Sequence, residues 1–228
     1  MQVATAPDYL AAIKHLPPGT FFHADNVSWE VYERLLNALS ETISVRVFYD
    51  QGRLEAMSPL GMHEKPAKVL QALITAIRYE FDIEIESYGQ TTLRKQMKAK
   101  GAEPDDSFYI QHAAQVIGPR ELDLTQDPPP DLVIESDLTS SSLNLFAIYA
   151  GLGVPEIWQI VNHEVVFWVL TKGVYQEAAA SRSFPFLSSE RLNDFVRIGL
   201  NQGQHRAARA FHQWMKKQNP PINSTPDA

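Results

Sequence analysis

The sequence predicts a mixed α/β fold of the α+β type, in which strands and helices come in separate runs. An alternating apolar hairpin lies near the N-terminus, a long helix with one apolar stripe follows it, and short strands come before and after a second helix. This order lacks the regular strand–helix alternation of a doubly wound sheet. The 228 residues of the chain are enough for one domain with a substantial core.

The two ends of the chain differ in composition from the middle. Prolines and a glycine mark residues 1–27 as an irregular lead-in. Residues 218–228 contain three prolines and predict a disordered tail. We therefore expect a single domain over residues 28–217.

The first half of this domain reads as helix, hairpin and helix. Leucines at helical spacing predict a helix over residues 29–40. Alternating apolar residues over 43–57, with a turn at 50–52, predict the hairpin. An apolar stripe over residues 69–81 predicts the long helix, and Pro66 is well placed in its first turn.

The second half reads as strands, one helix, more strands and a last helical region. The expected strands cover residues 83–87, 91–93, 105–110, 131–136, 157–161, 165–170 and 174–175. Serines that can cap a helix predict one over 142–152, ending at Gly153. The last helical region covers 189–217, with breaks near Gly199 and Gly203.

Charge and composition exclude several function classes. The net charge of -7 argues against a chain coated in phosphate-binding cations. Cysteine is absent, which excludes disulfides, thiolate chemistry and zinc–thiolate sites. No apolar run approaches the roughly 18 residues of a membrane span, and the N-terminus lacks a signal-peptide pattern. We expect a cytoplasmic protein without membrane contact.

One stretch of the acidic chain is basic. Four cations lie within residues 94–100, namely Arg94, Lys95, Lys98 and Lys100. Runs of charge are usually solvated loops. The same residues are the candidate nucleic-acid contacts of this sequence.

The strand expected over 131–136 is apolar but carries acids near both ends. Because strand side chains alternate between faces, Asp131, Val133 and Glu135 point to one side. A carboxylate buried beside an apolar strand requires a compensating partner, usually a cation or a metal. Asp131 lies roughly 13 Å from Glu135 along the strand, so it cannot easily join the same group of ligands.

A second acid is expected to face this strand. If the strands over 105–110 and 131–136 pair antiparallel, Asp105 lies opposite Glu135, with Cβ atoms about 5 Å apart. Two carboxylates at that separation repel unless one is protonated or a cation bridges them. Mg²⁺ suits an all-oxygen pair. The alternative is that these acids are turn formers beside prolines.

Several ordered motifs carry a resemblance to a known family. They are Met57-Ser58-Pro59, His63-Glu64, Gly101-Ala102-Glu103-Pro104-Asp105, Pro128-Pro129-Pro130-Asp131-Leu132-Val133-Ile134-Glu135, Thr139-Ser140-Ser141-Ser142-Leu143-Asn144 and Gly153-Val154-Pro155-Glu156. The chain resembles the Uma-type restriction endonuclease family, within the restriction-endonuclease-like PD-(D/E)xK superfamily. The resemblance implies a core over residues 63–161 of helix, three antiparallel strands, helix and strand, flanked by further helices and an added N-terminal hairpin.

The resemblance also implies an activity, a cofactor and partners. It implies an endonuclease that hydrolyses DNA phosphodiester bonds with Mg²⁺ or Mn²⁺, and a homodimer. Asp105 and Glu135 match the metal ligands of the family. Glu64 matches the acid on the first helix, which would position metal-bound water, and Asp131 matches the acid before the second strand. These four residues are the expected catalytic set.

The sequence departs from the family where a catalytic lysine is expected. The superfamily position is Asp137 here, and the position on the following helix is Leu145. A further basic residue expected after Trp158 is Gln159. The lysine orients and helps deprotonate the attacking water. Three hypotheses therefore stay open: an active endonuclease, a catalytically impaired relative that binds nucleic acid or a partner, and an interaction domain without nucleic acid.

Overall fold

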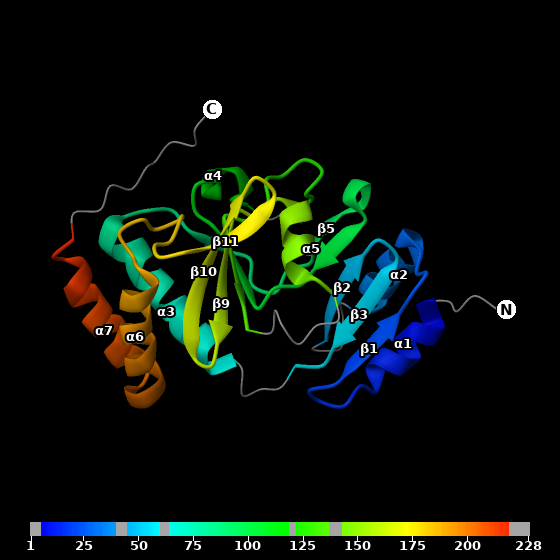
Figure 1. Cartoon of the computed structure of the whole chain (residues 1–228), viewed down its shortest axis with the longest axis horizontal. Coiled ribbons are helices and arrows are strands. Elements are labelled where there is room, and N and C mark those ends of the chain that lie inside the picture. Colours follow the sequence, from blue (N-terminus) through cyan, green and yellow to red (C-terminus); the bar gives the residue numbers. More distant parts are fainter. Residues whose placement is uncertain (1–5, 40–44, 60–63, 119–121, 137–142, 219–228) are drawn as a thin grey trace.

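The structure is a computed structural model that describes residues 6–39, 45–59, 64–118, 122–136 and 143–218, with backbone alone for residues 6–8 and 64. It is a mixed α/β fold, as the sequence predicts, and its strands form two sheets (Figure 1). Figure 1 shows helices beyond both sheets and one helix, α5, between them. The expected tail lies outside the described residues, apart from Gln218. No helix in the described ranges is both long and apolar enough to cross a membrane.

The first sheet is antiparallel throughout, in the order β1-β3-β2-β6-β5. Its strands are β1 (Phe21–Ala24), β2 (Arg46–Asp50), β3 (Arg53–Met57), β5 (Leu93–Lys95) and β6 (Lys100–Ala102). Helices α1 (Ala6–Lys14) and α2 (Trp29–Leu39) cover its outer face, where Ile13, Tyr32 and Leu35 are fully buried. The predicted hairpin is the β2–β3 pair.

The irregular lead-in predicted over residues 1–27 is wrong, because this segment contains α1 and β1. Proline suits the first turn of a helix, whose N–H groups need no helical partner, and Pro7 lies in the first turn of α1. Phe21 pairs with Met57 and Ala24 with Leu54, so β1 adds an edge strand to the hairpin. The pairing is long-range, which local patterns do not reveal.

The second sheet has the order β11-β10-β9-β8-β7-β4. Its strands are β4 (Glu86–Ser87), β7 (Asp106–Tyr109), β8 (Leu132–Glu135), β9 (Glu156–Val161), β10 (Glu164–Thr171) and β11 (Val174–Ala178). The β8–β9 pair is parallel and the others are antiparallel. A parallel pair needs a crossover, which α5 (Leu145–Leu152) supplies. A short helix, α4 (Ala113–Val116), lies in the connection between β7 and β8.

Opposite faces of β8 pack against different helices. Leu132 and Ile134 join the core formed with α3 (Glu64–Phe81), α6 (Ser189–Gln202) and α7 (Gln204–Met215), and these three helices lie together in Figure 1. Val133 faces α5, within a second core between the two sheets. Glu135 therefore points into that second core, because it shares a face with Val133.

The helical region near the C-terminus breaks at one glycine only. Gly203 separates α6 from α7, as expected. The break predicted near Gly199 is wrong, because this residue lies inside α6. A Cβ atom at Gly199 would lie 2.5 Å from a methyl carbon of Val69, so glycine is there to let α6 approach α3 closely.

The chain passes from the first sheet to the second at residues 103–105. It leaves β6 at Ala102 and enters β7 at Asp106. The basic stretch is therefore not a free loop, since it forms β5, the 3-10 helix η2 (Gln96–Lys98) and β6. This crossing places Asp105 where the two sheets meet, beside β2 of the first and β8 of the second.

Candidate active site

Asp105 and Glu135 lie opposite one another in adjacent strands. Strand β7 pairs antiparallel with β8, and Asp106 is the partner of Ile134. One further step in this register puts Asp105 opposite Glu135, and the Asp105 backbone N–H donates to the Ile134 carbonyl at 3.1 Å. The pairing expected from the sequence is confirmed, and it brings these two predicted metal ligands together.

One oxygen of Asp105 is held by the residue that follows Glu135. The Ser136 backbone N–H and its hydroxyl both donate to Asp105 Oδ2, at 2.6 and 2.5 Å. The other oxygen, Oδ1, contacts the Arg46 guanidinium through Nη2. The aspartate is therefore fixed between a neutral pair of donors and a positive charge.

The two carboxylate oxygens of Glu135 also have different partners. The Tyr149 hydroxyl of α5 donates to Glu135 Oε1. The other oxygen, Oε2, lies 3.6 Å from Arg46 Nη1. Burial, with the nearby Glu135 charge, raises the Tyr149 pKa well above its ordinary value, so the phenol stays protonated and able to donate.

Arg46 is the cation that the described residues place at this pair. It starts β2, and its side chain is 7% exposed, against 7% for Asp105 and 1% for Glu135. Within the described ranges, Nε and Nη1 of Arg46 have no hydrogen-bond partner. A buried donor without a partner costs about 1–3 kcal/mol, so the guanidinium is only partly satisfied by the two acids.

Sequence reasoning missed Arg46. The alternating hairpin was expected to bury the face of Val47 and Tyr49, and these residues do face α2. Arg46 and Phe48 take the other face. Phe48 belongs to the core between the sheets, and this aromatic residue between Val47 and Tyr49 was the available signal that its face is covered too.

A third acid, Glu103, lies at the crossing near Arg46. Its Oε2 accepts from the Val47 backbone N–H at 2.7 Å, and its Oε1 accepts from the Thr92 hydroxyl at 2.6 Å. Burial raises the Glu103 pKa, and these hydrogen bonds, followed by the positive charge of Arg46, oppose the rise. Glu103 thus links β2 to the start of β7 and adds negative potential beside the pair.

Two positions at which the family has basic residues, Leu145 and Gln159, supply no cation here. Leu145 is the first residue of α5, is 2% exposed and packs in the core between the sheets. Gln159 pairs with Glu135 across the parallel β8–β9 register, and its Oε1 accepts from Trp168 Nε1 at 2.9 Å. Asp137, the superfamily position, lies outside the described residues.

Asp131 lies apart from the Asp105–Glu135 pair. The Asp131 carboxylate accepts from the backbone N–H groups of Ile110 and His112, at 2.7 and 3.0 Å, and lies 2.6 Å from His112 Nδ1. Asp131 therefore stabilises the turn after β7, at the end of β8 remote from Glu135. Glu64 begins α3, and its side chain lies outside the description.

Two of the four predicted nucleic-acid contacts are engaged in ion pairs. Lys100 Nζ lies 2.6 Å from Asp50 Oδ1, and Arg94 Nε lies 3.0 Å from Glu33 Oε1. Lys95 and Lys98 have no ion pair within the described ranges, and Lys98 is exposed. The nucleic-acid contacts expected of this stretch stay a prediction.

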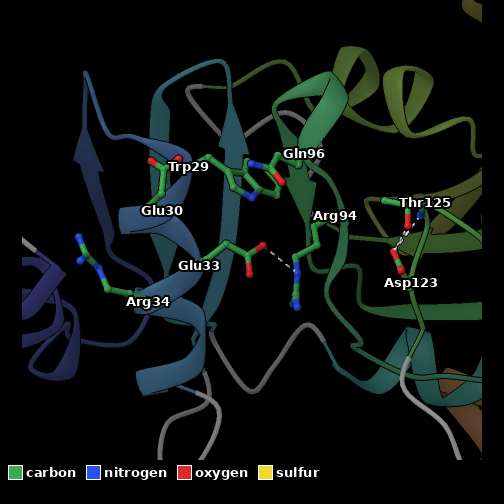
Figure 2. A pocket seen from close by; sticks show the side chains of 8 residues that line it. All are labelled: Trp29, Glu30, Glu33, Arg34, Arg94, Gln96, Asp123 and Thr125. Carbon is green, nitrogen blue, oxygen red and sulfur yellow. Dashed lines mark hydrogen bonds and ion pairs between the residues drawn. The ribbon is translucent and has the colours of Figure 1, made fainter.

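Arg94 belongs to the lining of a hollow of about 520 Å³, and Figure 2 shows the side chains around it. The lining residues are Trp29, Glu30, Glu33, Arg34, Arg94, Gln96, Asp123 and Thr125. Three of them are acids and two are arginines, and one dashed line in Figure 2 joins Arg94 to Glu33. This hollow is therefore not positively charged, and it does not resemble a phosphate-binding surface.

The donor chemistry of the pair fits a hard divalent cation. Asp105 Oδ1 and Glu135 Oε2 turn toward one cation, while their second oxygens are held by Ser136 and Tyr149. Carboxylate oxygens steadied by outer hydrogen bonds are the usual ligands of Mg²⁺ and Mn²⁺. No three His, Asp or Glu side chains within the described part of the chain are close enough to hold a metal, so water would complete such a site.

The comparison with family models agrees with the motifs. No curated protein matches the chain in sequence. A crystal structure described as "a putative nuclease belonging to DUF820", from Anabaena variabilis, is 16% identical, with a TM-score of 0.47 over 72% of this chain and 97% of that one. The model of a family named Uma2 and described as "Putative restriction endonuclease" matches residues 29–201. The matched residues make up most of this chain, and the chain therefore belongs to the Uma2 family of restriction-endonuclease-like proteins.

Proposed function

We propose that the chain is a Mg²⁺- or Mn²⁺-dependent endonuclease that hydrolyses DNA phosphodiester bonds. The observation that carries the proposal is the Asp105–Glu135 pair, with one oxygen of each acid turned toward a single cation site. Membership of the Uma2 family supports the same reaction class.

The residues of the pair have distinct tasks in this proposal. Asp105 Oδ1 and Glu135 Oε2 would hold the metal, which when bound lowers the pKa of water and offsets phosphoryl charge. Ser136 fixes the rotamer of Asp105, and Tyr149 fixes that of Glu135. Fixed carboxylates need little reorganisation during the reaction, which favours charge stabilisation in the transition state.

A second candidate function follows from Leu145 and Gln159. Both are buried, and neither carries a charge beside Glu135. Loss of one catalytic cation commonly lowers a rate by about 10²–10³. The chain would then be an impaired relative that binds nucleic acid or a partner, and Lys95 and Lys98 would serve that binding.

Nicking of supercoiled plasmid with Mg²⁺ or Mn²⁺ tests the first function. Asp105→Asn and Asp106→Asn form a matched pair, because Asp106 faces away from Glu135, toward Ser87. We expect the wild type and Asp106→Asn to nick the plasmid and Asp105→Asn to lose the activity. Equal activity in both variants would place the reaction elsewhere.

Leu145→Lys separates the two candidate functions. If the wild type is inactive and Leu145→Lys gains activity, the chain is an impaired relative that lacks only its lysine. If neither cuts DNA with either metal, although circular dichroism shows both to be folded, the nuclease proposal fails. Light scattering of the purified chain tests the proposed homodimer, which would supply one site for each DNA strand.

A further inference from the structure

The positive charge that contacts both Asp105 and Glu135 is the guanidinium of Arg46. Arg46 approaches both acids from the first sheet, through Nη2 to Asp105 Oδ1 and Nη1 to Glu135 Oε2. The remaining oxygen of each acid is already bonded, to Ser136 and Tyr149 respectively. The oxygens that face Arg46 are therefore the same ones that would bind a metal.

A guanidinium and a divalent cation cannot share this position. Both are positive, the space is enclosed, and in a poorly solvated site like charges repel strongly. Arg46 nevertheless fits the acids imperfectly, since Nε and Nη1 lack hydrogen-bond partners within the described ranges. An imperfectly satisfied ion is easier to displace than a fully bonded one.

We propose that Arg46 occupies the metal position as an internal counter-ion and competes with the divalent cation for Asp105 and Glu135. The inference rests on the proposed metal site and adds the residue that sets its affinity. Metal binding must move the guanidinium away from the pair. Glu103, whose carboxylate lies close enough to feel the charge of Arg46, is an acid toward which it can turn.

Calorimetric titration of Mn²⁺ and Mg²⁺ tests the competition without measuring activity. In Arg46→Gln the acids lose their competitor, and we expect the metal to bind roughly 10–100-fold more tightly than in the wild type. Arg53→Gln is the matched control, because Arg53 lies in the adjacent strand β3 with an exposed side chain, 3.7 Å from Asp25. It should bind metal like the wild type, and Arg46→Gln with Asp105→Asn should lose the tight binding.

The outcomes separate this inference from the proposed function. If the wild type binds metal through Asp105 and Arg46→Gln binds no more tightly, competition is wrong while the metal site stands. If neither the wild type nor Arg46→Gln binds either metal, the proposed metal dependence fails as well.

Arg46→Gln removes the positive charge that two buried acids share, so a measurement on the wild type guards against failure of the variant to fold. Arginine side-chain Nε–H signals can be followed by NMR during titration with Mg²⁺, and Arg46→Lys identifies the signal of Arg46. We expect this signal to shift and to exchange faster with water, while that of Arg53 stays unchanged. A shift at the Ser136 amide without any change at Arg46 would overturn the proposal.

Discussion

The Tyr149 hydroxyl of α5 donates to the Glu135 carboxylate at the end of β8, inside the core between the two sheets. Tyr149 is fully buried and Glu135 is 1% exposed. The contact is thus a polar link across an apolar layer, and it holds a helix against the acid whose position matters most to the proposed chemistry.

Tyr149→Phe should therefore destabilise the fold, because it removes a hydroxyl that donates a hydrogen bond to a buried carboxylate. Hydrogen bonds to charged groups contribute about 1.5–3 kcal/mol, against about 0.5–1.5 kcal/mol for neutral pairs. Tyr175→Phe is the comparison, since the Tyr175 hydroxyl donates at 2.6 Å to the neutral carbonyl of Val154 in the same core. Urea unfolding should show the larger loss of free energy for Tyr149→Phe, and an equal loss would contradict the charged role of Glu135.

Asp106→Asn should stabilise the protein near neutral pH. Burial raises the pKa of Asp106, so the folded state binds a proton more tightly than the unfolded state, and stability falls as pH rises from the unfolded pKa through the folded one. Asparagine removes this loss and keeps an acceptor oxygen for the Ser87 hydroxyl and the Ser107 N–H, which both donate to Oδ1.

Thermal unfolding at several pH values checks the prediction for Asp106. The difference between Asp106→Asn and the wild type should be largest near pH 7 and shrink as Asp106 becomes protonated at acid pH. Glu103→Gln is the contrasting variant. Burial raises the pKa of Glu103 too, but both of its oxygens accept hydrogen bonds. The side-chain amide nitrogen of glutamine would therefore face one of the two donors, the Val47 N–H or the Thr92 hydroxyl. We expect Glu103→Gln to be destabilising at neutral pH.

Gly199→Ala should destabilise the packing of α6 on α3, although alanine is the better helix former. The added Cβ would lie 2.5 Å from a methyl carbon of Val69, and overpacking of this kind costs about 1–3 kcal/mol. Val69→Ala removes that methyl group, so the double variant should recover part of the loss. If urea unfolding shows Gly199→Ala to be as stable as the wild type, close approach is not the reason for glycine here.

Local patterns were sufficient to predict the second sheet near the site. The prolines before Asp131 and the alternation along β8 fixed which side chains share a face, and antiparallel pairing then set Asp105 opposite Glu135. The same alternation separated Asp105 from Asp106. These deductions depend only on the period of a strand and on the pairing of neighbours, both of which a sequence carries directly.

Long-range pairings were not predictable in the same way. Strand β6 joins β2, with Gly101 opposite Tyr49, although many residues separate them along the chain. That pairing makes the basic stretch part of the first sheet, while α5 and the second sheet cover the face of the hairpin that carries Phe48. Arg46 lies on that covered face and reaches the two acids from the first sheet, so no motif near the acids could reveal it.

The crossing at residues 103–105 has a consequence for the smallest unit that could carry the chemistry. The core that the family resemblance implies, residues 63–161, contains both acids of the pair but begins after β2. A fragment cut at that boundary would retain Asp105 and Glu135 and lose the counter-ion they share. It would also lose the Val47 backbone N–H, from which Glu103 accepts a hydrogen bond. The N-terminal strands are therefore part of the site. Any segment that replaced them would have to supply a positive charge at the same point between the sheets.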